Sequence, residues 1–161
     1  MSTLHGFSDN KYEFLSNFYA CDIPYTLDNG EKIVFKTAEH AYQALKAISI
    51  DDLRYIANAS TPAAAKRRGR SIIIRPDWEE VKDDIMLQVL RIKFKNPEMQ
   101  ERILDTYNDG ITLFSEDNWW HDNYWGVCQC PDCPGFGKNK LGKLLTQVRE
   151  EVKNENEKGN T

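Results

Sequence analysis

At 161 residues, with 40% hydrophobic and 11% aromatic side chains, the chain is long enough for one globular domain with a buried core. The formal net charge is −4, and no segment gathers enough lysine and arginine for a long duplex-binding surface. This excludes binding along a long nucleic-acid duplex but leaves a nucleotide-sized ligand possible. The sequence has neither an apolar run of about 18 residues nor a basic-then-apolar leader, so we expect a cytoplasmic protein without a membrane partner.

A β-hairpin is predicted around Asn29-Gly30. These two residues stand between the alternating apolar runs CDIPYTL and EKIVF. Both residues tolerate the positive φ angles of a tight turn, and such a turn between alternating runs is a strong hairpin signal. We therefore expect two short antiparallel strands here.

Helical signals dominate the middle of the chain. Thr37 can cap a helix that runs to about Ile48, a short helix is expected over residues 51–59, and Thr61-Pro62 begins another that ends near Gly69. Apolar residues then repeat at intervals of three and four from Asp77 to about Phe94. This spacing predicts a long, half-buried helix.

The last third of the chain contains a long stretch in which apolar residues do not recur at regular intervals. Before it, Pro97 begins a helix to about Tyr107, and ITLFSE alternates like a strand. Residues 118–139 show no apolar repeat, and an irregular loop of this length usually serves a site. Leucines and valines from 141 to 152 predict a final helix, followed by a polar tail at residues 154–161.

The first predicted helix carries Glu39, Gln43 and Lys46 along one narrow stripe, between an apolar arc and a side of small alanines. In one interpretation the stripe faces water, and the helix dipole favours both charges. In the other it is sheltered and catalytic. The carboxylate would then be an acid or base, the amide would orient a ligand, and the amine would be a nucleophile with a pKa lowered by burial. The sequence leaves both interpretations open.

Three other segments allow a ligand contact or an ordinary structural role. FLSNFY is a packed turn or a binding loop. KRRGR is a phosphate clamp built from guanidinium groups or a solvated helix end. Trp78 stands at a helix start, where it can stack on a base or anchor the core.

The segment NWWHDNYWG surrounds His121 and Asp122 with four aromatic side chains. So many rings in an irregular loop favour a ligand site over core packing. Downstream, GFGKNKLGKLL leads a glycine-rich backbone into a helix N-terminus, an arrangement that offers amide donors to phosphate. Its spacing matches neither a Walker A motif nor a Rossmann fingerprint.

Three of the four cysteines gather in CQCPDC, at Cys128, Cys130 and Cys133. A structural zinc site needs four ligands, and the fourth would be Cys21, His121 or another histidine. Because no second Cys-x-x-Cys pair is present, the pattern favours free loop thiols and no cofactor over a structural zinc ion.

Taken in chain order, FLSNFY, TAEHAYQALK, KRRGR, HDNYWG and GKNKLGKLLTQVR resemble the motifs of the NADAR family of YbiA-like proteins, over residues 14–149. The resemblance implies a single helix-rich α+β domain, residues 1–153, with a small antiparallel hairpin, and a hydrolase that cleaves N-glycosidic bonds. Members of the family act on phosphoribosylated pyrimidine intermediates of riboflavin synthesis or remove ADP-ribose from guanine. The implied partner is therefore a nucleotide-like small molecule or ADP-ribosylated guanine in nucleic acid. The CQCPDC insertion departs from the glycine-rich YbiA-like pattern.

The resemblance also implies site residues. The expected catalytic residues are Glu39, Lys46 and Asp122. The predicted substrate-binding residues are Asn17, Phe18, His40, Gln43, Arg67, Arg70, Trp78, Tyr124, Trp125, Gly126 and Asn139.

Cleavage of a bond between ribose C1 and a base nitrogen places positive charge on the sugar. Asp122 or Glu39 is expected to stabilise this charge and to handle the proton, with both acids reaching one cavity. Lys46 either hydrogen-bonds the substrate and tunes Glu39, or attacks C1 and forms a Schiff base. Two other classes remain open: a non-catalytic module that binds ADP-ribose or an NAD derivative, and a zinc-dependent interaction protein built on the cysteine loop.

Overall fold

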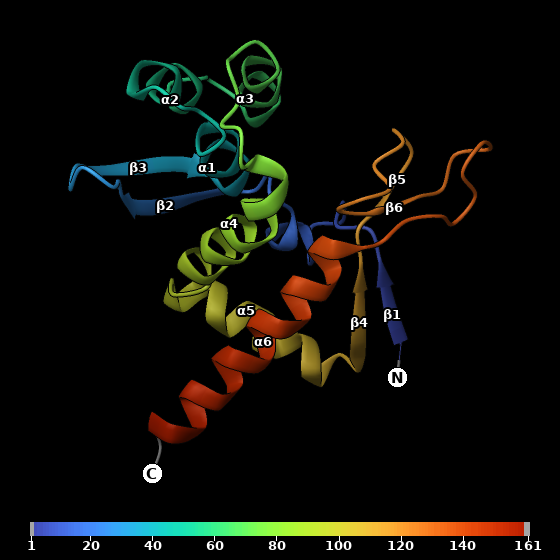
Figure 1. Cartoon of the computed structure of the whole chain (residues 1–161). Helices are drawn as coiled ribbons and strands as arrows, with labels where there is room; N and C mark the ends of the chain where they lie inside the picture. The colour runs from blue at the N-terminus through green and yellow to red at the C-terminus, as the bar shows by residue number, and fades with distance from the viewer. Residues whose placement is uncertain (1, 160–161) are drawn as a thin grey trace. The chain divides into compact units, whose positions relative to one another are not determined.

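Residues 2–159 are described by the structure, which is a computed structural model. Contacts between residues divide the chain into two compact units. Unit 1 comprises Met1–Ser16 and Phe94–Thr161, and unit 2 is the continuous segment Asn17–Lys93. Figure 1 labels the helices and strands of each unit.

Unit 2 begins with the predicted hairpin. Strands β2 (Ala20–Thr26) and β3 (Lys32–Thr37) pair antiparallel, which confirms the prediction. Gly30 in the turn has φ +87°, a backbone conformation that side chains disfavour. Ile23 and Phe35 are partners across the two strands and are fully buried, so one face of the hairpin contributes to the core of unit 2.

Helix α1 (Ala38–Ala44) lies at the centre of unit 2. Thr37 caps it as predicted, because its hydroxyl oxygen accepts a hydrogen bond from the His40 amide at 3.0 Å. All seven residues of the helix are buried, and the helix contacts β3 as well as the neighbouring helices α2, α3 and α4. A helix that is covered on several sides can hold polar side chains away from water.

The prediction that this helix runs to Ile48 is wrong, since α1 ends at Ala44. After the helix, the Lys46 amide donates to the Gln43 carbonyl at 3.3 Å, and the Ala47 amide donates to the Ala44 carbonyl at 3.1 Å. These three-residue bonds tighten the chain into a turn and end the α-helical ladder. Lys46 therefore lies in the turn that follows the helix.

The other helices of unit 2 begin near the predicted positions. Helix α2 (Ile50–Ala57) is capped by Ser49 and helix α3 (Pro62–Gly69) by Thr61, each hydroxyl accepting from an amide of the first turn. Helix α4 (Trp78–Lys93) contacts β2 and α1 and buries the apolar face that its spacing predicted. All three helix predictions are confirmed within a few residues.

Unit 1 contains a strand that the sequence pattern did not reveal. Strand β4 (Ile111–Ser115) forms as predicted, but it pairs in parallel with β1 (Ser2–His5). Four residues give too few alternating positions to recognise β1 in advance. Helices α5 (Pro97–Asn108) and α6 (Lys140–Gly159) pack on β4 and on each other (Figure 1), and the short 3-10 helix η1 (Glu13–Leu15) contacts α5.

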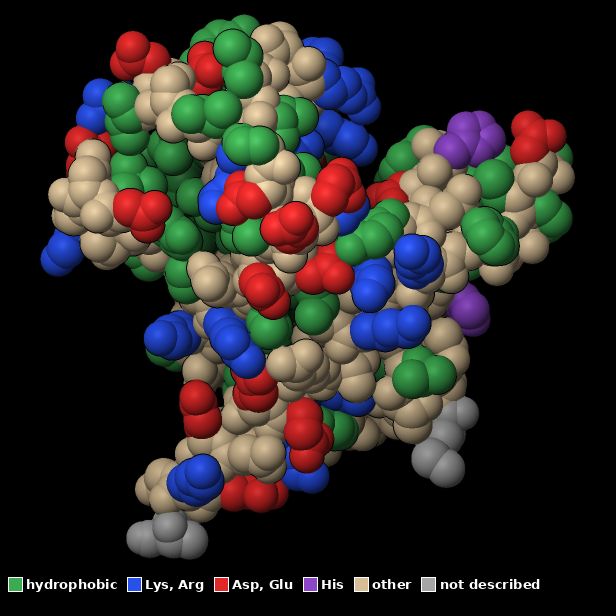
Figure 2. Space-filling model, viewed as in Figure 1, with side chains coloured by type: hydrophobic (Ala, Val, Ile, Leu, Met, Phe, Trp, Pro, Cys, Tyr) green, Lys and Arg blue, Asp and Glu red, His purple; other side chains and the backbone are tan. Residues whose placement is uncertain are grey.

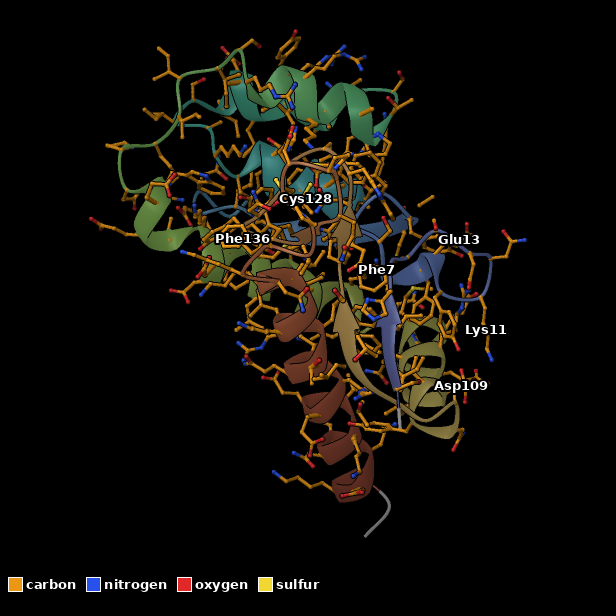
Figure 3. The ribbon with its side chains drawn as sticks, turned by 90° about the vertical axis from the view of Figure 1, so that its right-hand side faces the viewer. Phe7, Lys11, Glu13, Asp109, Cys128 and Phe136 are labelled. Carbon is orange, nitrogen blue, oxygen red and sulfur yellow. The ribbon has the colours of Figure 1, made fainter. Side chains whose placement is uncertain are left out.

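Arg149 links the elements of unit 1 from inside. Its guanidinium group donates to the Thr106 hydroxyl at 2.9 Å and to the Ile111 carbonyl at 2.8 Å, so the buried charge is solvated by protein groups of α5 and β4. At the surface of the same unit, Lys11 and Asp109 form an ion pair at 3.0 Å, and both side chains are labelled in Figure 3.

Helix α6 extends further than its apolar spacing predicted. The apolar stripe ends at Val152, which is buried, whereas residues 153–159 are exposed and still helical. Glutamate and lysine are good helix formers, and they continue the helix without a buried face.

Residues 118–139, predicted as a long loop, are mostly irregular. Strands β5 (Asp117–Asn118) and β6 (Val127–Cys128) form a two-residue parallel pair, and Cys128 makes an isolated bridge with Phe136 (labelled in Figure 3). The described chain thus combines helices with three sheets of two strands each, which confirms the helix-rich α+β class. Among residues 2–159, no helix combines the length and apolar character needed to cross a membrane.

Candidate functional site

Glu39 and Gln43 lie one turn apart on α1 and are both buried, with exposed fractions of 8% and 4%. The Gln43 side-chain amide donates to Glu39 Oε1 at 2.8 Å. The interpretation in which the stripe faces water is therefore wrong for these two residues. A carboxylate sheltered in this way needs hydrogen bonds from the protein or from a ligand, because burying a bare charge is costly.

Gly69 makes room for the Gln43 side chain. A Cβ atom added to Gly69 would lie 2.2 Å from Gln43 Oε1, far inside contact distance. The glycine of the KRRGR segment therefore lets α3 approach α1 closely enough to enclose the glutamine. The sequence pattern indicated a role for the arginines of this segment, whereas the structure shows that its glycine is needed for the close packing of α3 on α1.

Two buried acceptors in unit 2 lack a protein donor among residues 2–159. Asn17 Oδ1 and Gln43 Oε1 accept no hydrogen bond from any residue that the structure describes. Asn17 is nevertheless held in place: its Nδ2 donates to the Met86 sulfur at 3.4 Å, and its carbonyl accepts from the Glu39 amide at 3.0 Å. Because a buried acceptor without a donor is costly, a ligand or water donor is expected at both oxygens.

Lys46 lies against two aromatic rings. Its Nζ is 5.4 Å from the Tyr42 ring centroid and 5.8 Å from that of Trp78, and the two rings are 5.1 Å apart. The structure thus brings together Lys46 and Trp78, which were predicted from separate motifs. Tyr42 was not among the predicted site residues. Its position four residues before the lysine was the available signal, since such residues share a helix face.

The charges around Lys46 disfavour its protonated form. Burial lowers the pKa of the Lys46 ammonium below its ordinary value, the carboxylate of Glu39 opposes this, and the positive charges of Lys66, Arg70 and Lys82 lower the pKa further. The same positive charges would attract an anion such as phosphate. Figure 2 shows Lys and Arg side chains gathered near α3.

The predicted phosphate ligands Arg67 and Arg70 are both exposed, at the C-terminal end of α3. Phe18, predicted to contact substrate, is 44% exposed. These three residues are accessible to a ligand. Lys66 and Lys82 were not among the predicted site residues, and only the structure places their charges near Lys46.

His40 is buried, and protein groups contact both of its ring nitrogens. Nε2 lies 2.9 Å from the Ala59 carbonyl and Nδ1 lies 2.8 Å from the Thr37 hydroxyl. A carbonyl only accepts, so in the neutral ring Nε2 carries the hydrogen and Nδ1 accepts from the hydroxyl. Burial lowers the pKa of His40, which favours this neutral form. The histidine thereby links the start of α1 to the segment just after α2.

Asp122, the second predicted acid, organises the aromatic loop of unit 1. Its Oδ1 accepts from the amides of Tyr124 at 3.1 Å and Trp125 at 2.9 Å, and the two rings meet edge to face at 4.9 Å. The Asn118 side chain donates a hydrogen bond to the Asp122 carbonyl at 2.9 Å and accepts one from the Asp122 amide at 3.1 Å. Asp122 belongs to unit 1 and Glu39 to unit 2, and their sharing one cavity stays a prediction.

Gly126 and Asn139, also predicted to bind substrate, make close contacts inside unit 1. A Cβ atom on Gly126 would lie 2.2 Å from the Glu116 carbonyl oxygen. The Asn139 side chain donates to the Phe114 carbonyl at 2.8 Å and accepts from the Glu116 amide at 3.0 Å. Both residues therefore fasten the loop to the end of β4.

The backbone amides at the start of α6 are already bonded to the loop. Asn139 donates to the Gly126 carbonyl at 3.2 Å, Lys140 to Tyr124 at 3.1 Å and Leu141 to Trp125 at 2.9 Å. The predicted phosphate cradle is therefore wrong for these three amides, because each hydrogen already has a protein acceptor.

Three cysteines and a histidine converge in the same loop. His121 Nδ1 lies 3.4 Å from the sulfurs of Cys130 and Cys133 and 4.0 Å from that of Cys128. The four ligand atoms all lie within 4.8 Å of one another, so the group could hold a metal ion. His121 is one of the fourth ligands considered from the sequence. Cys21, another of them, lies in β2 of unit 2.

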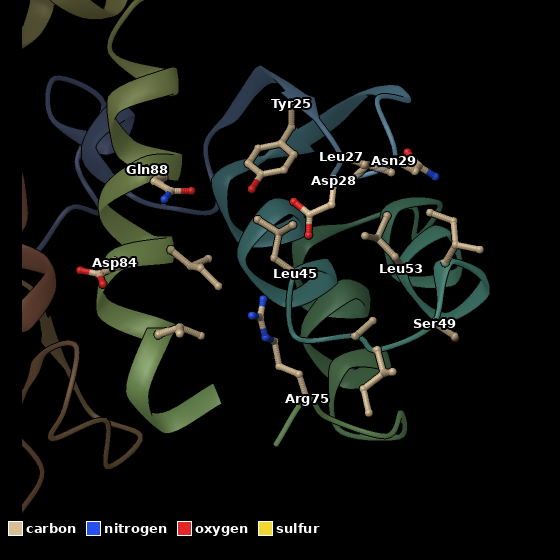
Figure 4. A pocket seen from close by; sticks show the side chains of 15 residues that line it. Tyr25, Leu27, Asp28, Asn29, Leu45, Ser49, Leu53, Arg75, Asp84 and Gln88 are labelled. Carbon is tan, nitrogen blue, oxygen red and sulfur yellow. The ribbon is translucent and has the colours of Figure 1, made fainter. Parts of the chain in front are cut away.

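Unit 2 also contains a pocket of about 480 Å³, between the hairpin turn, the start of α2 and α4 (Figure 4). None of the predicted catalytic or substrate-binding residues lines it. Its wall carries Asp28 and Asp84, which would repel a phosphate, and its Arg75 is paired with Asp77 at 2.6 and 2.9 Å. We therefore place the candidate site around Glu39 and Lys46 instead.

Comparison with known proteins gives consistent matches. The family model described as NADAR domain matches residues 5–153. N-glycosidase YbiA of Escherichia coli strain K12 is 33% identical over 148 residues, covering 90% of this chain and 84% of that protein. The NMR structure of E. coli YbiA superposes with a TM-score of 0.74 at 32% identity, covering 96% of this chain and 87% of that one.

A plant relative is much longer than this chain. Riboflavin biosynthesis protein PYRR, chloroplastic, of Zea mays is 32% identical over 150 residues, which is 85% of this chain but only 23% of the maize protein. The chain therefore spans about a quarter of that relative's length and matches one part of it.

Proposed function

Because the chain belongs to the NADAR domain family, we propose that it is a hydrolase of N-glycosyl bonds. The bond cleaved would join C1 of a ribose, phosphoribose or ADP-ribose to a base nitrogen. The proposal takes residues 1–153 as one NADAR unit, with residues 154–161 as a tail. The match over residues 5–153 and the likeness to a protein named as an N-glycosidase support it.

The observation that carries the proposal is the buried pair of Glu39 and Gln43. A sheltered carboxylate that is held by a side-chain amide can stabilise positive charge on a ribose ring and can move a proton. The free acceptors of Asn17 and Gln43 would take hydrogen bonds from ribose hydroxyls or from base amino groups. Asp122 is proposed as a second carboxylate of the reaction.

Lys46 and the rings beside it would hold the rest of the substrate. Its amine either hydrogen-bonds the ribose and tunes Glu39, or attacks C1 and displaces the base, which leaves with a proton. In the second case the C1–O bond of the ring then opens to give a Schiff base, and water hydrolyses it to release the sugar and restore the amine. The lowered pKa of Lys46 supports a larger neutral fraction, which the second alternative needs. Trp78 would stack on the base or sugar, while Arg67 and Arg70 would bind phosphate. Borohydride added during turnover separates the two alternatives, because only a Schiff base gives a trapped sugar adduct in intact mass spectrometry.

Two substrate classes fit the proposal. One is a ribosylaminopyrimidine of the riboflavin pathway, which the maize relative's name supports. The other is guanine carrying ADP-ribose, free or in nucleic acid. We place the activity in the cytoplasm, and the four cysteines free of disulfides are compatible with a reducing compartment.

The test is incubation with both substrate classes, free and in single-stranded nucleic acid, with mass spectrometry of the released base and sugar. Glu39→Gln is the matched control, since it keeps the shape and removes the charge. We expect its rate to fall at least about a hundredfold with binding largely retained. Full activity in Glu39→Gln would reject the assignment. Tight binding of ADP-ribose without release of base, from any substrate, would favour the non-catalytic module instead.

A further inference from the structure

The loop of unit 1 contains a cluster that the proposed reaction does not use. His121, Cys130 and Cys133 lie in irregular parts of residues 118–139, Cys128 ends strand β6, and the four ligand atoms all lie within 4.8 Å of one another. We propose that these four residues bind a structural zinc ion. This inference does not depend on the N-glycosidase activity.

Zinc fits the distances between the His121 nitrogen and the three sulfurs. Tetrahedral zinc with ordinary bond lengths places a histidine nitrogen about 3.6 Å from each cysteine sulfur. The observed distances from His121 Nδ1 are 3.4 Å to Cys130, 3.4 Å to Cys133 and 4.0 Å to Cys128. A thiolate-rich set with one imidazole is typical of zinc and not of magnesium or calcium.

Hydrogen bonding does not account for the convergence. A histidine Nδ1 has either one lone pair or one hydrogen, so it makes one good hydrogen bond, not three. Three sulfurs nevertheless lie within 4.0 Å of this nitrogen. A cation at the centre would let all three sulfurs and the nitrogen bind at once, with the three thiol protons released to solvent.

The backbone supports the same inference. His121 has φ +67°, in the left-handed region that few residues other than glycine adopt, although histidine enters it more often than most. A strained residue persists where its surroundings fix it, and such residues gather at ligand sites. Cys130 and Cys133 form a Cys-x-x-Cys turn closed by the Cys133 amide, which donates to the Cys130 carbonyl at 3.1 Å. The Asn123 amide points to the Cys133 sulfur at 3.7 Å, as outer-shell donors to thiolates do.

All four protein ligands are present, so the ion would have no open position for water or substrate. Its role would be to hold the loop. Asp122 directly follows His121 and fixes the amides of Tyr124 and Trp125, and Trp119 and Trp120 precede it with exposed fractions of 61% and 60%. Zinc at His121 would therefore position this whole aromatic segment.

The first test is the metal content of the untagged protein, expressed with added zinc and purified under reducing conditions. We expect one zinc per chain by elemental analysis. Cys130→Ser should lose most of it, whereas Cys21→Ser should keep it, because Cys21 lies in β2 outside the group. A wild-type protein with substoichiometric zinc, or a Cys130→Ser variant with the same zinc content, would overturn the proposal.

A second measurement uses only the wild-type chain, in case Cys130→Ser does not fold. Cobalt in place of zinc should give a sulfur-to-cobalt charge-transfer band and the intense visible bands of a tetrahedral ion. A thiol reagent should modify Cys21 alone in the zinc form and all four cysteines after chelation, with faster proteolysis between residues 118 and 139. Four equally reactive thiols in both states, or a disulfide within the group, would contradict zinc binding.

Discussion

Substitution of Gly69 by alanine tests the idea that close packing of α3 on α1 positions the carboxylate. The added Cβ would lie 2.2 Å from Gln43 Oε1, so this oxygen must retreat by about 1.2 Å to reach an ordinary contact distance. Glu39 Oε1 is bonded to the same amide at 2.8 Å, and a shift of that size is enough to break the bond. Overpacking costs about 1–3 kcal/mol and the better helix propensity of alanine returns up to about 1 kcal/mol, so folding should survive.

Activity should suffer more than stability. A hydrogen bond to a charged group contributes about 1.5–3 kcal/mol, which corresponds to a roughly ten- to hundredfold loss of kcat/KM in Gly69→Ala. The assay is kcat/KM for release of the base, together with urea unfolding of the same samples. If Gly69→Ala folds and turns over like the wild type, the packing argument is wrong.

A double-mutant cycle sharpens the test. With Gln43→Ala in place, the nearest remaining atom, Gln43 Cβ, is 3.5 Å from the added carbon, an ordinary contact. Gly69→Ala should then have little further effect on kcat/KM in that background. Additive losses would show that Gly69 acts on the site by a route other than Gln43.

Two predictions concern pH. Arg70→Gln should raise the pKa of Lys46, because the positive charge of Arg70 lowers it, so any rise of kcat with pH that reports the neutral amine should move to higher pH. Arg91→Gln on the exposed side of α4 is the control, and an unmoved profile for Arg70→Gln would contradict the charge assignment. His40 has a pKa below its ordinary 6.5 in the folded state. At pH values between the folded and the unfolded pKa, the unfolded chain therefore binds more protons than the folded protein. Stability should therefore be full above pH 6.5 and fall as the pH drops below it, in urea unfolding series. His40→Asn should lose this part of the pH dependence, and an unchanged slope in that variant would refute the role given to His40.

The sequence by itself determined the local elements that depend on near neighbours. Asn29-Gly30 fixed the hairpin, and Thr37, Thr61 and Pro97 fixed three helix starts, because turns and caps are bonds between residues a few positions apart. Helical spacing grouped Glu39, Gln43 and Lys46, and the family resemblance assigned them roles in the site. The sequence could not show whether these side chains are buried, because their burial depends on the elements that pack around α1.

Only the tertiary structure decided the features that join distant segments. The parallel pairing of β1 with β4, the contact of Gly69 with Gln43 and the charges around Lys46 each depend on residues far apart in the chain. The histidine that faces the three cysteines is closer to them in the chain, 7 to 12 residues away, but its choice also needed the structure. Local spacing allowed several possible fourth ligands, and the structure places His121 at the sulfurs. Chain entropy opposes such long-range contacts, so they form only through packing of the whole unit, and no short sequence pattern encodes them.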